Sequence, residues 1–283
     1  MASGADRTGW LERWRCRRQI QQSLRGRHDH IAAIYRQQLP NFIIIGAAKS
    51  ATTSLATALG RHPDIQISRS MEPKFFGRHY PRGWEWYASQ FEADPRRPLR
   101  GEASTMYSSS YSCYARTPEL IHHHLGAIPL IYLVRHPLRR IESHWRHWRG
   151  RINDCPPFDQ LLRSPRLRQR IVEASLYHQQ WQRYRRWFPQ QSMLSITTEE
   201  LSQHPQQQLQ RILRFIGATP DCTGLLEQGE LPVMNTAGSK GRQEIAPPAW
   251  NGDLKQRTID LLRPDSERFL SATGRPLNTW AWD

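Results

Sequence analysis

Cysteine is scarce in this chain of 283 residues, and its few cysteines are far apart in the sequence. They are Cys16, Cys113, Cys155 and Cys222. No pair has the C-x-x-C spacing of a zinc-binding or redox motif, so the sequence predicts neither a zinc site nor a disulfide framework. Such cysteine usage fits a reducing compartment best, and we expect a cytoplasmic protein.

Long apolar runs are also missing. None approaches the roughly 20 residues that a transmembrane helix needs, and the N-terminal region lacks the uninterrupted apolar core of a secretion signal. Residues 1–40 instead carry arginines among apolar side chains that include Trp14, Ile20 and Ile31. This spacing predicts a basic amphipathic helical extension, which could lie on an anionic membrane surface, cover the domain or stand in solvent. We expect a single large domain to follow it, over residues 41–283.

Acidic residues are few compared with basic ones. The chain has 25 Asp and Glu against 40 Lys and Arg, which gives a formal net charge of +15. This surplus implies an anionic partner such as a nucleotide, an acidic glycan, nucleic acid or a membrane surface. The charge alone does not choose among these partners.

The glycine-rich nucleotide signatures are absent as well, although a buried strand, a loop and the start of a helix follow one another between Asn41 and Leu55. Lys49 follows Gly46 by three residues, without a glycine directly before it. Neither G-x-x-x-x-G-K-[ST] nor G-x-G-x-x-G therefore applies. In the stretch Lys-Ser-Ala-Thr-Thr over residues 49–53, backbone N–H groups, a helix N-terminus and one lysine favour an anion. The alternative is an ordinary turn whose lysine is solvated.

Carboxylates follow the next two predicted strands. The strand over residues 65–68 leads to Glu72, and a third strand ends near Glu102. In a parallel sheet both glutamates should emerge at the carboxyl edge, where ligands bind in open α/β folds. Glu72 is therefore a candidate catalytic base, and a surface glutamate ahead of a proline turn is the alternative.

A second anion site is predicted after the strand over residues 130–134. Arg135 stands at its carboxyl end, and Pro137 suits the first position of a helix because its missing N–H costs nothing there. The hydroxyl of Ser143 on this helix could share an anion with the Arg135 guanidinium. Further arginines should add to a positive field around the site, namely Arg139, Arg140, Arg146, Arg149 and Arg151.

The rest of the chain continues the alternation of strands and helices. The patterns predict helices over residues 170–188, 204–216 and 253–262, and a strand over residues 192–197. The fold class is therefore α/β, a single domain with a central, mainly parallel sheet flanked by helices. A polar, glycine-broken and basic stretch over residues 235–243 is either a loop that closes over an anion or a disordered connector.

Three consecutive histidines, His122, His123 and His124, raise the possibility of a metal site. Consecutive side chains on a helix point about 100° apart, so they should not converge on one ion. We expect these histidines on a helix surface and no metal in the protein.

Taken together, the motifs resemble those of sulfotransferases that use 3′-phosphoadenosine 5′-phosphosulfate (PAPS), in the branch with heparan sulfate sulfotransferases and bacterial relatives. The resemblance covers roughly residues 41–282. In order along the chain it rests on the 5′-phosphosulfate loop Lys49–Thr53, the turn His62–Asp64, the catalytic-glutamate motif Glu72–Phe76, the 3′-phosphate motif Arg135–Pro137 with Ser143, the contact Ser175–Tyr177 and the cofactor loop Lys240–Arg242.

The resemblance implies a P-loop-like sulfotransferase fold and a role for each matched residue. Glu72 would be the catalytic base and Lys49 the group that stabilises the leaving phosphate. The donor, PAPS, would be bound by Lys49, Ser50, Ala51, Thr52, Thr53, Ser54, Arg135, Ser143, Tyr177, Lys240, Gly241 and Arg242. The acceptor would be a hydroxyl or an amine, and we expect a carbohydrate. The reaction needs no metal, because lysine, arginine and backbone dipoles supply the positive charge.

Three departures from the family pattern bear on this assignment. His136 stands where the 3′-phosphate motif commonly has an acidic residue or asparagine. Ala103 stands where glycosaminoglycan enzymes of this branch have a lysine, which weakens the case for a heparan-like acceptor. The cysteine pair of secreted relatives is absent, in agreement with an intracellular enzyme.

Two other functions fit part of the pattern. A nucleoside or sugar kinase would need magnesium and an acidic residue to hold it, whereas the short lysine loop and the arginine–serine site argue against that reading. A non-catalytic basic module would bind nucleic acid or an acidic glycan through its arginines. We expect no nucleic-acid partner.

Overall fold

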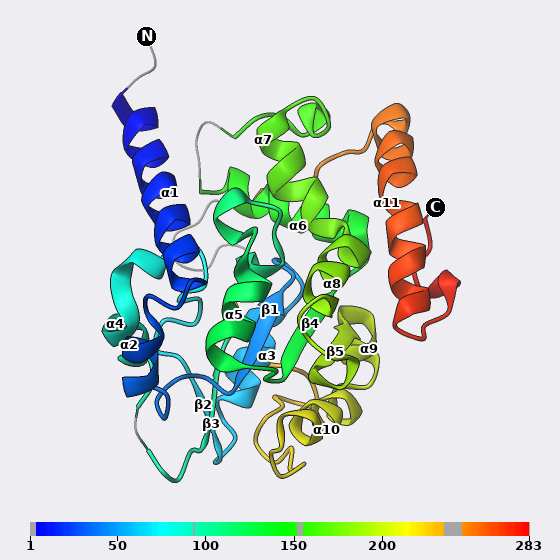
Figure 1. Ribbon diagram of the computed structural model, residues 1–283. Helices are drawn as coiled ribbons and strands as arrows, with labels where there is room; N and C mark the ends of the chain where they lie inside the picture. The colour runs from blue at the N-terminus through cyan, green and yellow to red at the C-terminus, as the bar shows by residue number, and fades with distance from the viewer. Residues whose placement is uncertain (1–3, 93, 152–154, 235–244, 283) are drawn as a thin grey trace.

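Parallel strands form the centre of the protein (Figure 1). The computed structural model describes residues 4–92, 94–151, 155–234 and 245–282, with only the backbone of residues 4–13. Within these residues the sheet has five strands in the order β2-β3-β1-β4-β5, and every neighbouring pair is parallel. The strands are β1 Phe42–Gly46, β2 Ile65–Ile67, β3 Leu99–Glu102, β4 Leu130–Val134 and β5 Met193–Thr197.

This strand order contains a switch point between β1 and β4. After β1 the chain builds β2 and β3 on one side, and after β4 it builds β5 on the other. In such sheets the loops leave the two central strands in opposite directions and open a crevice at their carboxyl ends. The sheet thereby fixes in advance where a ligand can bind.

Helices cover both faces of the sheet (Figure 1). The α-helices are α1 Gly4–Ser23, α2 Asp29–Ile34, α3 Thr52–Leu59, α4 Gly83–Ala88, α5 Thr117–Leu125, α6 Pro137–Arg149, α7 Pro165–Leu167, α8 Tyr177–Arg185, α9 Thr198–Gln203, α10 Pro205–Ile216 and α11 Gly252–Ala272. Short helical turns include η1 Tyr80–Arg82, η2 Thr105–Ser108, η3 Ser112–Tyr114 and η5 Arg168–Val172. No described helix is both long and apolar enough to cross a membrane.

Side chains that alternate in direction along the central strands explain the two core layers, one on each face of the sheet. In β4, Leu130, Tyr132 and Val134 pack in one core cluster, whereas Ile131 and Leu133 pack in the other. Successive strand residues point to opposite faces, so a strand that is apolar throughout must be covered on both sides. Side chains of α5, α8 and α11 complete the first cluster, and those of α3, α9 and α10 complete the second.

The N-terminal helices pack on the first of these layers. Cys16 and Ile20 of α1 and Ala32 of α2 are buried in the same cluster as Phe75 and Tyr80. The boundary that we predict at residue 40 thus separates sequence segments that share one core. The role of this segment toward membranes stays a prediction.

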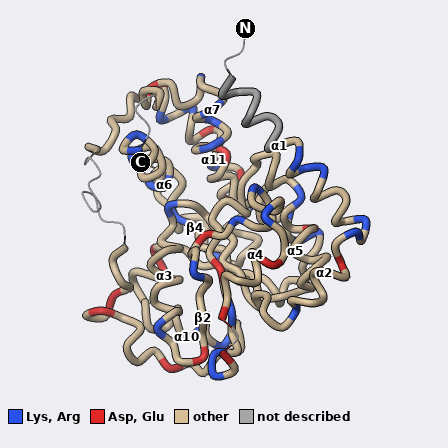
Figure 2. The backbone as a smooth tube through the Cα atoms, turned by 90° about the vertical axis from the view of Figure 1, so that its left-hand side faces the viewer, with Lys and Arg blue, Asp and Glu red and all other residues tan. Residues whose placement is uncertain are grey.

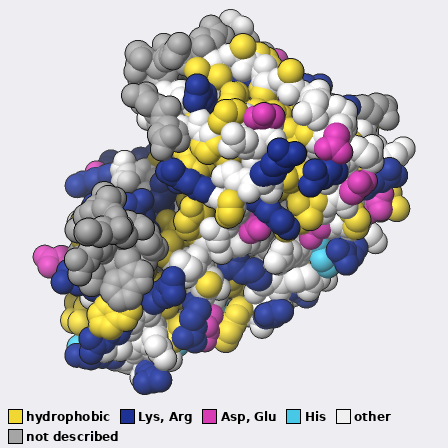
Figure 3. All heavy atoms as spheres, turned by 90° about the horizontal axis from the view of Figure 1, so that it is seen from above, with side chains coloured by type: hydrophobic (Ala, Val, Ile, Leu, Met, Phe, Trp, Pro, Cys, Tyr) yellow, Lys and Arg dark blue, Asp and Glu magenta, His cyan; other side chains and the backbone are white. Residues whose placement is uncertain are grey.

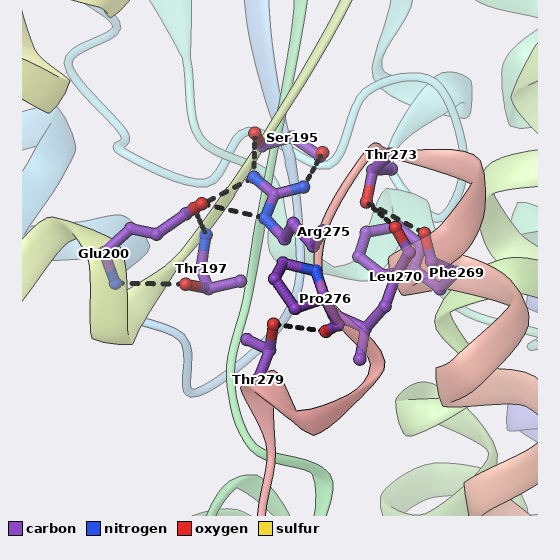
Figure 4. Close-up of polar contacts among 9 residues, drawn as sticks. All are labelled: Ser195, Thr197, Glu200, Phe269, Leu270, Thr273, Arg275, Pro276 and Thr279. Carbon is purple, nitrogen blue, oxygen red and sulfur yellow. Dashed lines mark hydrogen bonds and ion pairs between the residues drawn. The ribbon is translucent and has the colours of Figure 1, made fainter.

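The C-terminal end is tied to the far edge of the sheet by one arginine (Figure 4). Arg275 donates to both carboxylate oxygens of Glu200 at 2.9 Å and to the Ser195 carbonyl at 2.7 Å. Glu200 also forms a capping box with Thr197 at the start of α9. One side chain therefore joins β5, α9 and the segment after α11.

Two predicted helices differ from the structure. Residues 170–188 are not one helix, because the chain passes through η5 and a 3-10 turn and breaks at Leu176, which has ψ 73°, before α8 begins. The last helix is longer than residues 253–262 because it continues through Pro264 to Ala272. Buried Phe269 and Leu270 pack on the sheet layer, and this tertiary packing outweighs the unfavourable proline.

Candidate active site

The loop after β1 has the backbone of an anion-binding nest. Lys49 has φ 71° and Ala51 has φ 56°, so left-handed residues alternate along the loop just before α3 begins at Thr52. Such a conformation turns backbone N–H groups toward one concavity, which the N-terminus of α3 makes more positive. Ser50 is fully buried, and its hydroxyl has no hydrogen-bond partner among the described residues.

Gly46 allows another segment to approach this loop closely. A Cβ atom at Gly46 would lie 2.0 Å from the Ser108 hydroxyl and 3.1 Å from the Thr105 carbonyl. Only glycine fits here, also because its φ is +147°. The end of β1 is thereby packed against η2, which carries Thr105 toward the second part of the site.

A buried arginine of α6 supports the loop after β1. Arg140, one of the arginines that we expect to add to the positive field around the site, is fully buried. Its guanidinium donates to the Ala48 carbonyl at 3.3 Å, to the Ser175 hydroxyl at 2.6 Å and to the Ile171 carbonyl. Burial lowers the pKa of Arg140. The side chain links α6 to the loop and to the turn before α8, so it fixes the loop instead of facing a ligand.

A histidine of the same helix reaches the loop lysine. The Nδ1 atom of His147 on α6 lies 3.4 Å from the Lys49 Nζ atom. One turn earlier on α6, His144 is buried, and its Nδ1 atom lies 3.0 Å from Arg140. Burial, with Arg140 as a further cause, lowers the pKa of His144 well below its usual value, so this imidazole is neutral at pH 7. Neither histidine is among the predicted site residues, although their spacing from Arg140 along α6 is a signal in the sequence.

Arg135 stands beside this loop, at the end of the neighbouring strand. Gly46 pairs with Tyr132 across β1 and β4, and Lys49 and Arg135 each follow three residues later. The two cations thus leave the same edge of two adjacent parallel strands, as the sequence predicts. Tyr177 is fully buried and donates its hydroxyl to the Arg135 carbonyl at 2.7 Å. This hydroxyl contacts the backbone of Arg135, and a direct contact of Tyr177 with the donor stays a prediction.

His136 takes a capping role at the start of α6. Its Nδ1 atom accepts from the Leu138 backbone N–H at 3.2 Å, and its own backbone N–H donates to Glu199 at 2.9 Å. The Nε2 atom binds the Ala281 carbonyl near the C-terminal end. Burial lowers the pKa of His136, so the ring is neutral at pH 7 and can accept as asparagine would. The departure from the family pattern therefore keeps the capping function.

Glu72 lies on the other side of the β1 end. One carboxylate oxygen accepts from the Thr105 hydroxyl at 3.1 Å, and the other lies 2.9 Å from the Lys74 Nζ atom. The Glu72 side chain is 33% exposed, so solvent or an acceptor can reach it. An anchored but accessible carboxylate meets the geometric requirement for a general base.

A second, buried carboxyl group fixes the backbone of the Glu72 segment. Glu102 is fully buried and accepts from Tyr87 at 2.6 Å, from Tyr107 at 3.0 Å and from Ser104. The hydroxyls of Ser104 and Tyr107 in turn accept from the backbone N–H groups of Lys74 at 2.8 Å and of Phe76 at 3.0 Å. Glu102 therefore positions the hydroxyls of Ser104 and Tyr107, and these hydroxyls bind the backbone of the segment around residues 72–76.

Burial is the main cause that raises the pKa of Glu102 to about 7. The three hydroxyl donors oppose this effect, and the neighbouring Glu72 carboxylate adds to it. Glu102 lies at the end of β3, as predicted, and the strand pattern alone gives no sign that its side chain is buried.

For the other predicted site residues, the structure gives the position in the fold or, for three of them, no description. Thr52, Thr53 and Ser54 form the first turn of α3, and Ser143 lies on α6 beyond Arg135. Lys240, Gly241 and Arg242 lie outside the described residues. The described chain resumes at Ile245, whose carbonyl accepts from Arg146 of α6 at 2.6 Å.

Basic side chains are distributed widely around this framework. Lys and Arg positions recur along the backbone in Figure 2, and the face seen in Figure 3 carries them across its middle with hydrophobic side chains between them. Such a surface attracts anionic ligands over a long range.

A comparison with protein families matches the sulfotransferase domain over residues 39–231. Among curated proteins, the chain is 27% identical over 264 residues to mouse heparan sulfate glucosamine 3-O-sulfotransferase 3B1, a match that covers 87% of this chain and 66% of the relative. The human protein of that name is 30% identical with the same coverage. The chain thus spans slightly less than two thirds of the length of the first of these relatives.

Solved structures agree on the fold. A sulfotransferase from Alicyclobacillus acidocaldarius superposes with a TM-score of 0.68 at 23% identity, covering 85% of this chain and 98% of that one. A mouse sulfotransferase complexed with PAP gives a TM-score of 0.52 at 18% identity, covering 86% and 89%. The expected P-loop-like α/β sulfotransferase fold is confirmed.

Proposed function

Because the chain belongs to the sulfotransferase domain family, we propose that it is an enzyme that moves a sulfuryl group from PAPS to an acceptor, a hydroxyl group of a carbohydrate. The curated relatives are named for such a reaction on heparan sulfate. The observation that carries the proposal is the placement of Lys49 and Arg135 at the carboxyl ends of adjacent parallel strands, at the switch point of the sheet.

The residues at this edge fit a nucleotide with phosphates at both ends of its ribose. The nest at residues 49–51, the unpartnered Ser50 hydroxyl and the N-terminus of α3 suit the 5′-phosphosulfate. The guanidinium of Arg135 suits a separate phosphate, and Ser143 on the following helix can add a hydroxyl. The donor set consists of cations, hydroxyls and backbone N–H groups, which is the chemistry that binds such anions.

The chemistry of the acceptor side follows from the Glu72 carboxylate. Glu72 is proposed to take the proton of the acceptor hydroxyl while sulfur is attacked in line, and Lys49 to stabilise the negative charge that grows on the leaving phosphate. Thr105 and Lys74 hold the two Glu72 oxygens, so the carboxylate is oriented before the acceptor arrives. Arg140 contributes by fixing the loop backbone at Ala48.

The proposal is tested by donor binding and by transfer. Isothermal titration should show binding of adenosine 3′,5′-bisphosphate without magnesium, and Lys49→Ala should weaken it. Radiolabelled sulfate from PAPS should then be transferred to at least one member of a panel of glycans and small hydroxyl acceptors. Tight binding of ATP with no affinity for the bisphosphate would contradict the proposal and favour a kinase.

A further inference from the structure

Three side chains with metal-binding atoms meet where α2 packs against α5. They are Asp29 at the start of α2 and His123 and His124 near the end of α5. The two helices lie near each other in both views of the backbone (Figures 1 and 2). Because α5 ends at Leu125, shortly before β4 begins at Leu130, this cluster lies toward the amino ends of the strands. It is therefore separate from the proposed donor site at their carboxyl ends.

The ligand atoms of this cluster converge. The His123 Nε2 atom lies 2.8 Å and the His124 Nδ1 atom 3.7 Å from the same Asp29 carboxylate oxygen, and one ligand atom from each residue lies within 4.8 Å of the others. The expectation that neighbouring histidines on this helix cannot converge is wrong for His123 and His124, whose ring centroids are 4.6 Å apart. The expected position on a helix surface is also wrong for His124, whose side chain is 2% exposed.

These distances match the size of a zinc site. With zinc–nitrogen and zinc–oxygen bonds of about 2.0–2.2 Å, two ligand atoms in a tetrahedral site lie roughly 3.3 Å apart. The distances of 2.8 and 3.7 Å bracket this value, so only small side-chain rotations are needed. Asp29 and His123 are partly exposed, which leaves a path for the ion and a position for water.

The second nitrogen of His124 has the environment of a metal ligand. Its Nε2 atom lies 2.7 Å from the Ser23 hydroxyl, which is also bonded to Tyr80. An Nε2–H that donates to Ser23 leaves the Nδ1 lone pair directed toward Asp29, and oxygen partners of this kind fix the ring of metal-bound histidines. Trp84 packs edge-on against the His124 ring, with centroids 4.6 Å apart, and limits its rotation.

We propose that Asp29, His123 and His124 form a structural site for a divalent transition-metal ion of the zinc type, with water as a further ligand. Two imidazoles and one carboxylate suit such an ion, whereas magnesium and calcium prefer oxygen ligands alone. The site is structural because it is remote from Glu72 and Lys49. Its ligands come from segments that are 94 and 95 residues apart. A bound ion therefore clamps the N-terminal helices onto α5.

Zinc titration of the full chain, stripped with EDTA beforehand, tests the proposal. The wild type should bind one zinc ion with a dissociation constant of about 1 µM or tighter. His123→Ala and Asp29→Asn should each weaken binding by at least about tenfold. The matched controls are His122→Ala, next to the site on α5, and His30→Ala, next to it on α2, and both should bind zinc as the wild type does.

Two further measurements use only the wild type, so their outcome does not depend on whether a variant folds. On the wild type alone, cobalt should give the visible spectrum of a four-coordinate site, and zinc at 100 times its dissociation constant should raise Tm by about 5 °C. Magnesium at the same concentration should not raise Tm. Wild-type binding weaker than about 1 µM, or equal losses in His122→Ala and His123→Ala, would overturn the proposal. Sulfuryl transfer reports on a different edge of the sheet, so its failure leaves this result unaffected.

Discussion

On one side of the site, Lys49 and Arg135 extend from the ends of β1 and β4. On the other side, Glu72 follows β2 and Glu102 is the last residue of β3. The cations are placed by short motifs, since each lies within three residues of a strand end. The carboxylates are held by hydrogen bonds from other segments, such as those of Tyr87 to Glu102 and of Thr105 to Glu72.

Because they are held differently, the two halves of the site should respond differently to substitution. A change in the cationic half removes a charge from the ligand, so donor affinity should fall while the fold persists. A change in the carboxylate half alters the proton chemistry or the support of the base, so turnover or pH dependence should change while donor affinity persists.

The largest effect is expected for Glu72→Gln. The amide keeps the shape and the bond from Thr105 but cannot accept a proton at neutral pH, so turnover should fall by about 1,000-fold. Affinity for adenosine 3′,5′-bisphosphate should stay within about twofold of the wild type, as measured by isothermal titration. Glu85→Gln on α4 is a suitable control. A variant that keeps wild-type turnover would remove Glu72 from the role of base.

The next effect concerns pH and Glu102. Its pKa rises from 4.5 to about 7 on folding, so the folded state holds the proton more tightly than the unfolded chain. The unfolded chain ionises first as pH rises through this window, so stability is fully present below pH 4.5 and falls until about pH 7. The loss is about 3 kcal/mol, from about 1.4 kcal/mol for each pH unit.

Urea unfolding at several pH values checks this prediction. Glu102→Gln carries a neutral amide at every pH, so its stability should lack the decrease between pH 4.5 and 7, whereas Glu92→Gln, with an exposed carboxylate, should keep the wild-type slope. Identical slopes in the wild type and in Glu102→Gln would contradict the assigned role of burial.

A smaller effect is expected for Arg135→Ala. Loss of a charge-assisted contact of about 1.5–3 kcal/mol should weaken binding of adenosine 3′,5′-bisphosphate by about 10- to 100-fold. Arg139→Ala, an exposed arginine on α6, the helix that follows Arg135, is the matched control and should change affinity little. If both variants bind alike, the basic surface as a whole attracts the nucleotide, and Arg135 has no special place.

The smallest effect is expected for Thr197→Ala at the end of β5. It removes the capping box of α9 and should lower the free energy of unfolding by about 1 kcal/mol. Glu199 of α9 accepts from the His136 backbone N–H next to Arg135, so donor affinity should also fall, but only slightly. Thr198→Ala, one residue later, is the control in chemical denaturation. A larger loss of donor affinity than of stability would show that α9 belongs to the cationic half.

Much of the fold follows from local patterns. The strand over residues 130–134 and the start of α6 at Pro137 agree with the sequence analysis to the residue, because an apolar run bounded by a proline is a strong signal. The extent of α11 was not predictable in this way, because Pro264 is tolerated only by virtue of the packing of Phe269 and Leu270.

The same division holds for the site. Local patterns suffice to predict that Lys49, Glu72 and Arg135 come after the ends of strands, because strand and loop lengths are local properties. Packing of the layers is needed to bury Arg140 beside the loop, to bring Glu102 to the segment of the base, and to bring Asp29 to His123 and His124. These contacts join residues far apart in sequence, and burial and hydrogen bonding between such residues are set only when the layers pack together.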